Sequence, residues 1–380
     1  MNGMQSFLGF GDAGVAHYDF KKWQHDLFQT QSLEISPCLC YTANAKPIAC
    51  FMQNGGNMSD KKWTLMVYLS ANQWTAVHPE LYFEDEMWDW LLEEAPKRGF
   101  NHFLLDVGDG IEYQSHPEIS TKNAWSHRRV HKELARCREK GITVIPKVNF
   151  SSFHCNWMKQ YARMISSDIY YKVCTDIIRE VYEVFEHPEY IHLGMDEEDI
   201  NMAKNREYAV CRHGELYWHD LRYLVDCVAD TGAKPTIWYD AAFVNPEEYR
   251  RRFDIDEVLL CPWYYWSLDP KNFTKMKDFP YRGQFDHLGL DVIEDLPRLK
   301  NFRELGIAFA KEGQTYLPTS CQSRPNNIYN LMKYMTAAPD ERILGHIVAP
   351  WHPTLLSEKP YFEKAFDDFV AAKRELYPDE

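Results

Sequence analysis

The sequence predicts an α/β protein built on a single large (β/α)8 barrel of the TIM type. Short apolar runs of strand length alternate with longer amphipathic stretches of helical period, which is typical of parallel strands connected by helices. Eight such repeats follow one another within about 290 residues, a length that suits one closed barrel. Polar and aromatic residues follow these runs directly, and barrels of this type carry their functional groups at the carboxyl ends of the strands.

The predicted strands are short and rich in apolar and β-branched residues. They lie at residues 63–70, 101–108, 142–150, 190–196, 234–240, 257–266, 314–320 and 343–351. Residues 120–141 carry apolar side chains at helical spacing and end at Gly141, a residue suited to a helix C-terminus. Residues 170–188 show the same spacing, and we expect Pro188 to end that helix.

An open, doubly wound α/β sheet is the alternative architecture. Such sheets commonly bind nucleotides through a glycine-rich turn that follows a strand. Neither GxGxxG nor GxxxxGK[ST] follows any predicted strand, so the sequence does not support a nucleotide site.

Residues 1–57 differ from the rest of the chain because they show little hydrophobic periodicity. Met58 is followed by Ser, Asp and two Lys residues, and the first predicted strand begins directly after them. We therefore expect residues 1–57 to be a poorly ordered or accessory extension, or sequence upstream of the natural start. Residues 58–380 are expected to form the (β/α)8 catalytic domain.

The composition argues against several classes of partner. With 42 basic and 56 acidic residues the formal net charge is −14, so we expect neither nucleic acid nor an anionic membrane as a partner. No apolar run of about 18 residues predicts a membrane span, and no secretion signal is visible at the amino terminus. The ten cysteines are scattered without a CxxC pair, which favours reduced thiols and a cytoplasmic location.

The most informative stretch is HLGMDEED, residues 192–199, in which four acidic side chains follow a predicted strand. Gly194 allows the backbone to turn or to approach another segment closely. Asp196 and Glu197 are neighbours, so on an extended backbone their side chains point to opposite sides. Hydrolysis of a glycosidic bond needs an acid and an anion near the sugar, and adjacent carboxylates raise the pKa of one of them. We therefore expect an acid/base pair here.

Other interpretations of the acidic cluster concern a helix start and a metal. Acidic residues stabilise the first turn of a helix, and Glu198 and Asp199 suit that role. Four carboxylates also attract calcium, but DEED lacks the spaced ligands and the glycine of a calcium-binding loop. No HExxH motif and no cysteine pair with zinc spacing occurs, so we expect neither a metal nor another cofactor.

The residues around this cluster resemble glycoside hydrolase family 20, the β-N-acetylhexosaminidases. HLGMDE is similar to the family's H-x-G-G-D-E signature at strand 4, with Met195 at the second glycine. Three further segments are similar to strands 3, 5 and 8 of the family: residues 144–154, 236–240 and 345–351. His154 falls one position later than the histidine of the strand-3 segment. The resemblance covers most of residues 63–355, and its specific motif is the one at strand 4.

The resemblance implies a role for each matching residue. Glu197 is expected to be the general acid. Asp196 is expected to orient the 2-acetamido group of the substrate, whose own carbonyl oxygen attacks the anomeric carbon. Tyr316 is expected to donate a hydrogen bond to the acetamido oxygen. Three tryptophans are expected to wall the sugar: Trp238, Trp263 and Trp351.

The sequence departs from the family at two positions that bind sugar hydroxyls. The arginine of strand 1 is absent, and Ser70, Ala71 and Asn72 occupy its place. The glutamate of the strand-8 W-x-E motif is also absent, because proline stands at position 353. The acid chemistry is therefore retained in the sequence, while the usual hydroxyl-binding groups are not.

Other polar residues at strand ends are further candidates for substrate binding. Asp240 would bind substrate, act as a nucleophile or base opposite Glu197, or cap the next helix. His154 lies in the loop SSFHCNW and would contact the substrate or serve as a structural histidine. Asn149 and Asp106, near the ends of the third and second strands, complete the set.

Two alternative functions remain open at this point. The first is a glycosidase of another specificity that uses Glu197 and Asp240 as a two-carboxylate pair. The second is a catalytically inactive barrel that binds glycans, which the missing arginine and glutamate favour. A carbohydrate is the expected ligand in each case, while the sugar epimer, the linkage and the oligomeric state are open.

Overall fold

The computed structural model describes residues 61–73, 77–198, 208, 210–265 and 296–380, with the backbone alone for residues 296–303. The extension expected at residues 1–57 and Asp199 of the acidic cluster lie outside the described residues. The described helices include none that is long and apolar enough to cross a membrane.

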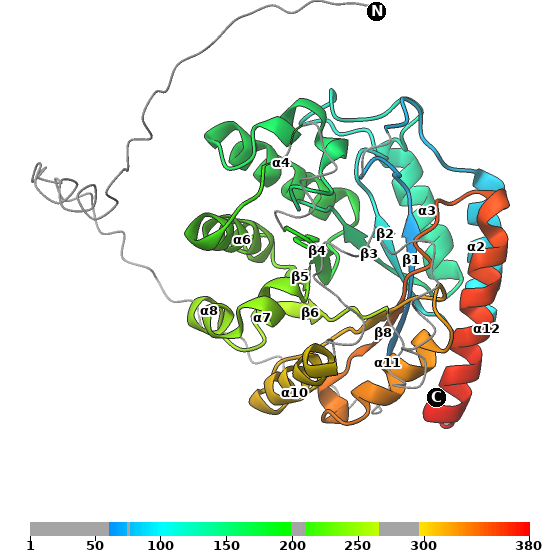
Figure 1. Ribbon diagram of the computed structural model, residues 1–380. Helices are drawn as coiled ribbons and strands as arrows, with labels where there is room; N and C mark the ends of the chain where they lie inside the picture. The colour runs from blue at the N-terminus through cyan, green and yellow to red at the C-terminus, as the bar shows by residue number, and fades with distance from the viewer. Residues whose placement is uncertain (1–60, 74–76, 199–207, 209, 266–295) are drawn as a thin grey trace, which may run out of the picture. The chain divides into compact units, whose positions relative to one another are not determined.

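Eight parallel strands form the centre of the fold (Figure 1). They are β1 (Lys62–Tyr68), β2 (His102–Asp106), β3 (Thr143–Lys147), β4 (Tyr190–His192), β5 (Lys234–Trp238), β6 (Leu259–Cys261), β7 (Thr319–Ser320) and β8 (Gly345–Val348). All eight predicted strands are confirmed. Each is shorter than predicted, because the paired part of each strand covers only part of its predicted run.

The strands follow the order β6-β5-β4-β3-β2-β1-β8-β7, so each pairs with its neighbour in the chain except where β1 meets β8. Parallel bridges between Leu260 and Tyr316 and between Trp263 and Thr319 join the two ends of this order. The Thr319 backbone N–H also donates a hydrogen bond to the carbonyl oxygen of Pro262 (2.7 Å). These contacts complete the ring, so the (β/α)8 barrel is confirmed and the open sheet is excluded.

Helices surround the strand ring on its outside (Figure 1). They are α2 (Asp85–Lys97), α3 (His127–Glu139), α4 (Asp168–Val184), α6 (Gly214–Ala229), α7 (Asp240–Val244), α8 (Pro246–Arg252), α10 (Leu296–Glu312), α11 (Asn327–Met335) and α12 (Lys359–Leu376). Short 3-10 helices lie between them: η1 (Asn156–Arg163), η4 (Asp340–Arg342) and η5 (Leu356–Glu358).

The ends of α3 and α4 test two predictions. Gly141 follows the C-terminus of α3 with a left-handed φ of +73°, so its predicted role at a helix end is confirmed. Pro188 does not end α4, because the helix already stops at Val184. Glu186 and His187 have left-handed φ angles that turn the chain before the proline is reached.

Alternation along the strands divides the core into two layers. Met66 and Trp238 belong to the cluster enclosed by the strands, whereas Leu65 and Ile237 pack with the helices in the outer cluster. Side chains alternate along a strand with a period of two. The residue two positions after the last inward-facing strand residue therefore also faces the barrel axis, and it lies at the carboxyl end of the barrel. Asn149, Asp240, Trp263 and Trp351 occupy such positions.

Candidate active site

The loop after β4 turns sharply because three of its residues have left-handed backbone conformations. The φ angles are +72° at Gly194, +64° at Met195 and +55° at Glu197. A Cβ atom on Gly194 would lie 1.9 Å from Oδ1 of Asn149, so this close approach requires glycine. The same Oδ1 accepts a hydrogen bond from the Met195 backbone N–H (3.3 Å). The loops that follow β3 and β4 therefore interlock.

Asp196 is oriented by the loop that follows β3. Its Oδ1 accepts a hydrogen bond from Asn149 Nδ2 (3.0 Å), and its backbone carbonyl oxygen accepts one from Ser151 Oγ (2.6 Å). Its second carboxylate oxygen lies 3.5 Å from His154 Nε2, and the side chain is 14% exposed. The Asp196 carboxylate is thus fixed in direction while it remains accessible from the barrel mouth.

Glu197 and His154 form a close pair at the same place. His154 Nε2 lies 3.1 Å from Glu197 Oε2, and the side chains are 4% and 22% exposed respectively. Burial disfavours the charged imidazole, but the Asp196 and Glu197 carboxylates outweigh burial and raise the pKa of His154. The raised pKa favours the charged imidazole, which offsets part of the negative charge of the two carboxylates.

These three residues also meet one geometric condition for a metal site. Among the described residues, His154, Asp196 and Glu197 each bring one ligating atom to within 4.8 Å of the others. The same groups can also exchange a proton with one another, because His154 Nε2 lies within 3.5 Å of both carboxylates. The arrangement therefore suits either a metal ion or proton transfer.

Asp240 reaches this pair from the carboxyl end of β5. Its Oδ1 accepts a hydrogen bond from the Glu197 backbone N–H (3.3 Å), and its Oδ2 accepts one from Trp263 Nε1 (2.7 Å). Burial, followed by the negative charges of Asp196 and Glu197, raises the pKa of Asp240 to about 7, although the Trp263 hydrogen bond opposes the shift. A raised carboxyl pKa was expected within the adjacent pair, and the structure shows one on Asp240, which contacts that pair.

We expect the Asp240→Asn variant to show a flatter dependence of stability on pH than the wild type. Since the pKa of Asp240 rises from 3.8 to about 7, the folded protein keeps a proton that the unfolded chain has lost between these values. The contribution of Asp240 to the free energy of unfolding therefore falls over this range, by at most about 1.4 kcal/mol per pH unit. Urea denaturation at a series of pH values measures the slope.

The matched control for this measurement is Asp230→Asn. Asp230 is exposed at the end of α6, and its removal should leave the slope of the wild type unchanged. The same slope in the wild type and in Asp240→Asn would show that the Asp240 carboxyl does not hold a proton in the folded protein.

Aromatic side chains line the mouth beside the acidic residues. The rings of Trp263 and Tyr265 stack with centroids 5.3 Å apart, and Tyr265 meets Trp351 edge-on at 6.0 Å. Trp238 lies beneath Trp351, with ring centroids 5.9 Å apart, and is only 1% exposed. Trp263 and Trp351 are therefore available to a ligand, whereas Trp238 supports Trp351 from below and does not offer a face of its own.

Tyr265 is a mouth residue that sequence reasoning missed. Burial, followed by nearby anionic groups that include Asp196 and Glu197, raises the pKa of Tyr265, which places its hydroxyl within the field of the acidic pair. The alternation of side chains along the strand could have identified Tyr265. It follows Trp263 by two positions, and Trp263 follows Cys261 by two. The tyrosine chosen from the sequence was instead Tyr316.

The prediction that Tyr316 binds substrate is wrong. Tyr316 is fully buried in the outer cluster, where its ring meets that of Tyr239 edge-on at 6.0 Å. Its neighbour Leu317 belongs to the inner cluster, so alternation directs Tyr316 away from the barrel interior.

The prediction that Asp106 binds substrate is also wrong. Asp106 is fully buried inside the barrel, where it forms an ion pair with Lys147. The Lys147 ammonium lies 6.0 Å from the centroid of the Trp238 ring, and the His192 ring packs against the same tryptophan at 4.3 Å. These residues form a layer beneath the mouth, so Asp106 balances a buried cation there.

The positions where the family's hydroxyl-binding arginine is missing are occupied by an internal network. Ser70 Oγ and Asn72 Nδ2 both donate hydrogen bonds to the carboxylate of Asp109, the second at 2.9 Å. Asn72 also accepts a hydrogen bond from the His78 backbone N–H (2.6 Å). These polar groups therefore tie the loops after β1 and β2 to one another.

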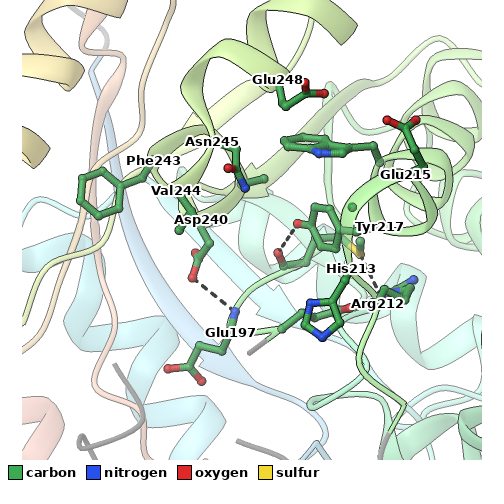
Figure 2. Close-up of a pocket in the computed structure, with 15 residues that line it drawn as sticks. Glu197, Arg212, His213, Glu215, Tyr217, Asp240, Phe243, Val244, Asn245 and Glu248 are labelled. Atoms are coloured by element: carbon green, nitrogen blue, oxygen red, sulfur yellow. Dashed lines mark hydrogen bonds and ion pairs between the residues drawn. The ribbon is translucent and has the colours of Figure 1, made fainter. Parts of the chain in front are cut away.

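A cavity of about 880 Å³ adjoins the loop after β4 on the side of α6 and α7 (Figure 2). Glu197 and Asp240 contribute to its lining, together with Tyr217, Trp218 and Asn245. Tyr217 donates a hydrogen bond from its hydroxyl to the carbonyl oxygen of Met195 (3.0 Å), and so supports the loop from this side. In Figure 2 the carboxyl group of Glu197 extends away from Tyr217.

Comparison with known proteins supports the fold. No protein-family model and no curated protein matches the sequence. Among solved structures, a family 20 β-N-acetylhexosaminidase from Streptomyces coelicolor matches over 82% of this chain and 64% of its own, with 12% identity and a TM-score of 0.56. The β-N-acetylhexosaminidase of Bacteroides fragilis matches over 83% of this chain and 66% of its own, with 15% identity and a TM-score of 0.54.

A third similar structure is a β-hexosaminidase mutant of Streptomyces plicatus in complex with the product GlcNAc. It matches over 82% of this chain and 63% of its own, with 11% identity and a TM-score of 0.54. The chain thus spans slightly less than two thirds of the length of these three proteins. The fold is a (β/α)8 barrel that is similar to those of these three proteins. More particularly, it is a family 20-like fold, as the strand-4 motif predicted.

Proposed function

We propose that the protein is a glycoside hydrolase that cleaves β-linked N-acetylhexosaminides with the help of the substrate's own acetamido group. The observation that carries this proposal is the arrangement of His154, Asp196 and Glu197 at the carboxyl end of β4. Two carboxylates with different partners stand side by side there, next to aromatic side chains that suit a sugar ring. The family 20-like fold agrees with this assignment.

In the proposed first step, the acetamido carbonyl oxygen of the substrate attacks the anomeric carbon. The bond from that carbon to the leaving oxygen breaks, and Glu197 gives its proton to the leaving oxygen. His154, whose Nε2 lies 3.1 Å from Glu197 Oε2, donates a hydrogen bond to the carboxylate that remains. Asp196, held by Asn149, accepts a hydrogen bond from the acetamido N–H and stabilises the positive charge of the cyclic intermediate.

In the second step, water attacks the anomeric carbon of this intermediate. The Glu197 carboxylate removes a proton from the water, and the bond to the acetamido oxygen breaks, which restores the acetamido group. Tyr265 replaces Tyr316 as the proposed donor to the acetamido oxygen, because it lies between Trp263 and Trp351 at the mouth.

A two-carboxylate glycosidase that uses Glu197 and Asp240 is the second candidate. The pKa of about 7 at Asp240 favours it, because a carboxyl of that pKa suits acid/base catalysis near neutral pH. Against it, both carboxylate oxygens of Asp240 already accept hydrogen bonds, from the Glu197 backbone N–H and from Trp263 Nε1. These contacts favour a role for Asp240 in holding Glu197 and Trp263.

Substrate preference tests the proposal. We expect the protein to hydrolyse an aryl β-N-acetylhexosaminide at least about 100-fold faster than the matching aryl β-hexoside, because only the first carries the internal nucleophile. The Asp196→Asn variant should lose about 100-fold in kcat on the acetamido substrate, since it no longer orients that group. A chromogenic release assay on a panel of both substrate types measures these rates.

Asp89→Asn serves as the control, because Asp89 is an exposed residue of α2 whose side chain is 58% exposed. It should keep the wild-type rate. Faster hydrolysis of the plain hexoside would reject substrate assistance and favour the pair Glu197 and Asp240. Sugar binding without turnover of any panel member would instead favour a glycan-binding barrel.

A further inference from the structure

Glu198 follows the proposed acid directly, and the helix start that the sequence suggested after it lies outside the described residues. Its carboxylate is held by the guanidinium of Arg212 through Nε (2.9 Å) and Nη2. The two side chains are 2% and 0% exposed. A buried, two-point contact between a guanidinium and a carboxylate fixes the direction of both groups.

The same Arg212 guanidinium reaches three separate parts of the chain. Its Nη1 donates a hydrogen bond to Asp220 Oδ2 on α6 (3.0 Å), and its Nη2 donates one to the carbonyl oxygen of Phe150 after β3 (2.8 Å). Glu198 Oε1 in turn accepts a hydrogen bond from the Ser152 backbone N–H (2.8 Å). Arg212 and Glu198 therefore join the loop after β3, the loop after β4 and α6.

A gain in stability does not by itself explain why this buried ion pair is present. Burying two charges costs much of what their attraction returns, and apolar replacements of buried ion pairs are often as stable. The loop that it holds, however, contains non-glycine residues in left-handed conformations, at Met195 and Glu197. Such conformations cost on the order of 1 kcal/mol each and persist where the surroundings impose them.

We propose that the Arg212–Glu198 pair is a positioning clamp that sets the separation between Glu197 and His154. Ser152, which Glu198 binds, lies two residues before His154, and Glu198 itself follows Glu197 directly. The clamp thus joins the two backbone segments that carry the 3.1 Å contact. In this role Arg212 and Glu198 act on the chemistry through these two segments. The effect on rate rests on the proposed glycosidase function, whereas the effect on the histidine environment does not.

The test uses Arg212→Lys, which keeps the charge but loses the two-point contact, and Glu198→Gln, which keeps the shape but loses the charge. In each variant kcat should fall about 10- to 100-fold while KM changes less than about threefold, because the acid is misplaced and the sugar contacts are not. The double variant should lose little more than either single one, since the pair acts as a unit. Thermal unfolding identifies any variant that fails to fold. If Arg212→Lys does not fold, the kcat of Glu198→Gln tests the clamp.

The second readout is the titration of His154, followed by NMR of its ring protons and assigned with His154→Gln. Among the described residues, the charged groups with the largest effects on His154 are Asp196, Glu197 and Lys147, and both variants keep all three. Release of Glu197 should lower the pKa of His154 relative to the wild type. This readout is independent of any enzymatic activity.

Arg222→Lys is the matched control, because Arg222 lies on α6 in a half-exposed pair with Asp226 and Glu257. It should change neither kcat nor the His154 titration. The clamp would be overturned if folded variants of Arg212 and Glu198 showed the same His154 titration as the wild type. Where turnover is measurable, their kcat would also have to lie within about twofold of the wild-type value. A wild type that hydrolyses no aryl glycoside would reject the proposed function, and the titration alone would then decide on the clamp.

Discussion

Replacement of Glu197 by glutamine should lower kcat by about 100- to 10,000-fold, the usual contribution of a positioned general acid. Glutamine has nearly the shape of glutamate but no proton to give to the leaving oxygen. Substrates whose leaving groups need no proton, such as dinitrophenyl glycosides, should be affected far less. Steady-state kinetics on aryl glycosides with a range of leaving groups measures this difference.

A measurement of sugar affinity distinguishes a variant that has lost proton transfer from one that has lost its binding site. The Glu197→Gln variant should bind a sugar ligand within a fewfold of the wild type in calorimetry, because its aromatic contacts are intact. Glu189→Gln is the control, since Glu189 is 68% exposed and should tolerate the change at full activity. Equal loss of turnover on all leaving groups would assign the proton transfer to another residue.

Replacement of Gly194 by alanine should destabilise the protein by about 2–5 kcal/mol. The new Cβ atom would lie 1.9 Å from Oδ1 and 2.2 Å from Cγ of Asn149, and the residue would also be strained at a φ of +72°. Asn149 cannot move away without losing its hydrogen bonds to Met195, Ser151 and Asp196. Activity should fall together with stability, because Asn149 orients Asp196.

Gly141→Ala provides a control that shares the backbone strain without the clash. Gly141 has a φ of +73°, and no heavy atom would lie within 4 Å of an added Cβ. This variant should lose only about 1–2 kcal/mol, the cost of a left-handed alanine. Urea denaturation of both variants measures the difference. Equal destabilisation of the two would show that the approach of Asn149 to Gly194 does not constrain the loop.

The strands and the acidic pair could be predicted because they depend on local properties. Apolar runs of strand length must be buried, whatever the rest of the chain does, and Gly194 marks the point where the chain turns. The eight strand–helix repeats predicted the barrel, and the motif around Asp196 and Glu197 predicted the strand that carries the candidate site. The family resemblance also selected Trp263 and Trp351, whose rings lie on either side of Tyr265.

The errors arose where side-chain direction decides the role. Tyr316 and Asp106 were selected as polar or aromatic residues near strand ends, yet Tyr316 faces the helices and Asp106 lies one layer too deep. Every second residue of a strand faces the same side, so counting from Cys261 to Trp263 and on by two more positions would have selected Tyr265 instead. The partner of Asp106 could not be predicted, because Lys147 lies on another strand and their contact depends on the register of the sheet.

The amino-acid sequence by itself determined the order of strands and helices, the closed barrel and the two acidic residues at its mouth, because periodicity and backbone preference act within a few residues. Tertiary structure alone decided how those acidic residues are used. It brought His154 to Glu197, Asn149 to Asp196 and Arg212 to Glu198 across distances in sequence that no local pattern spans. The electrostatic environment of a carboxyl group depends on which charges and how much protein surround it in space, and only the folded chain specifies those neighbours.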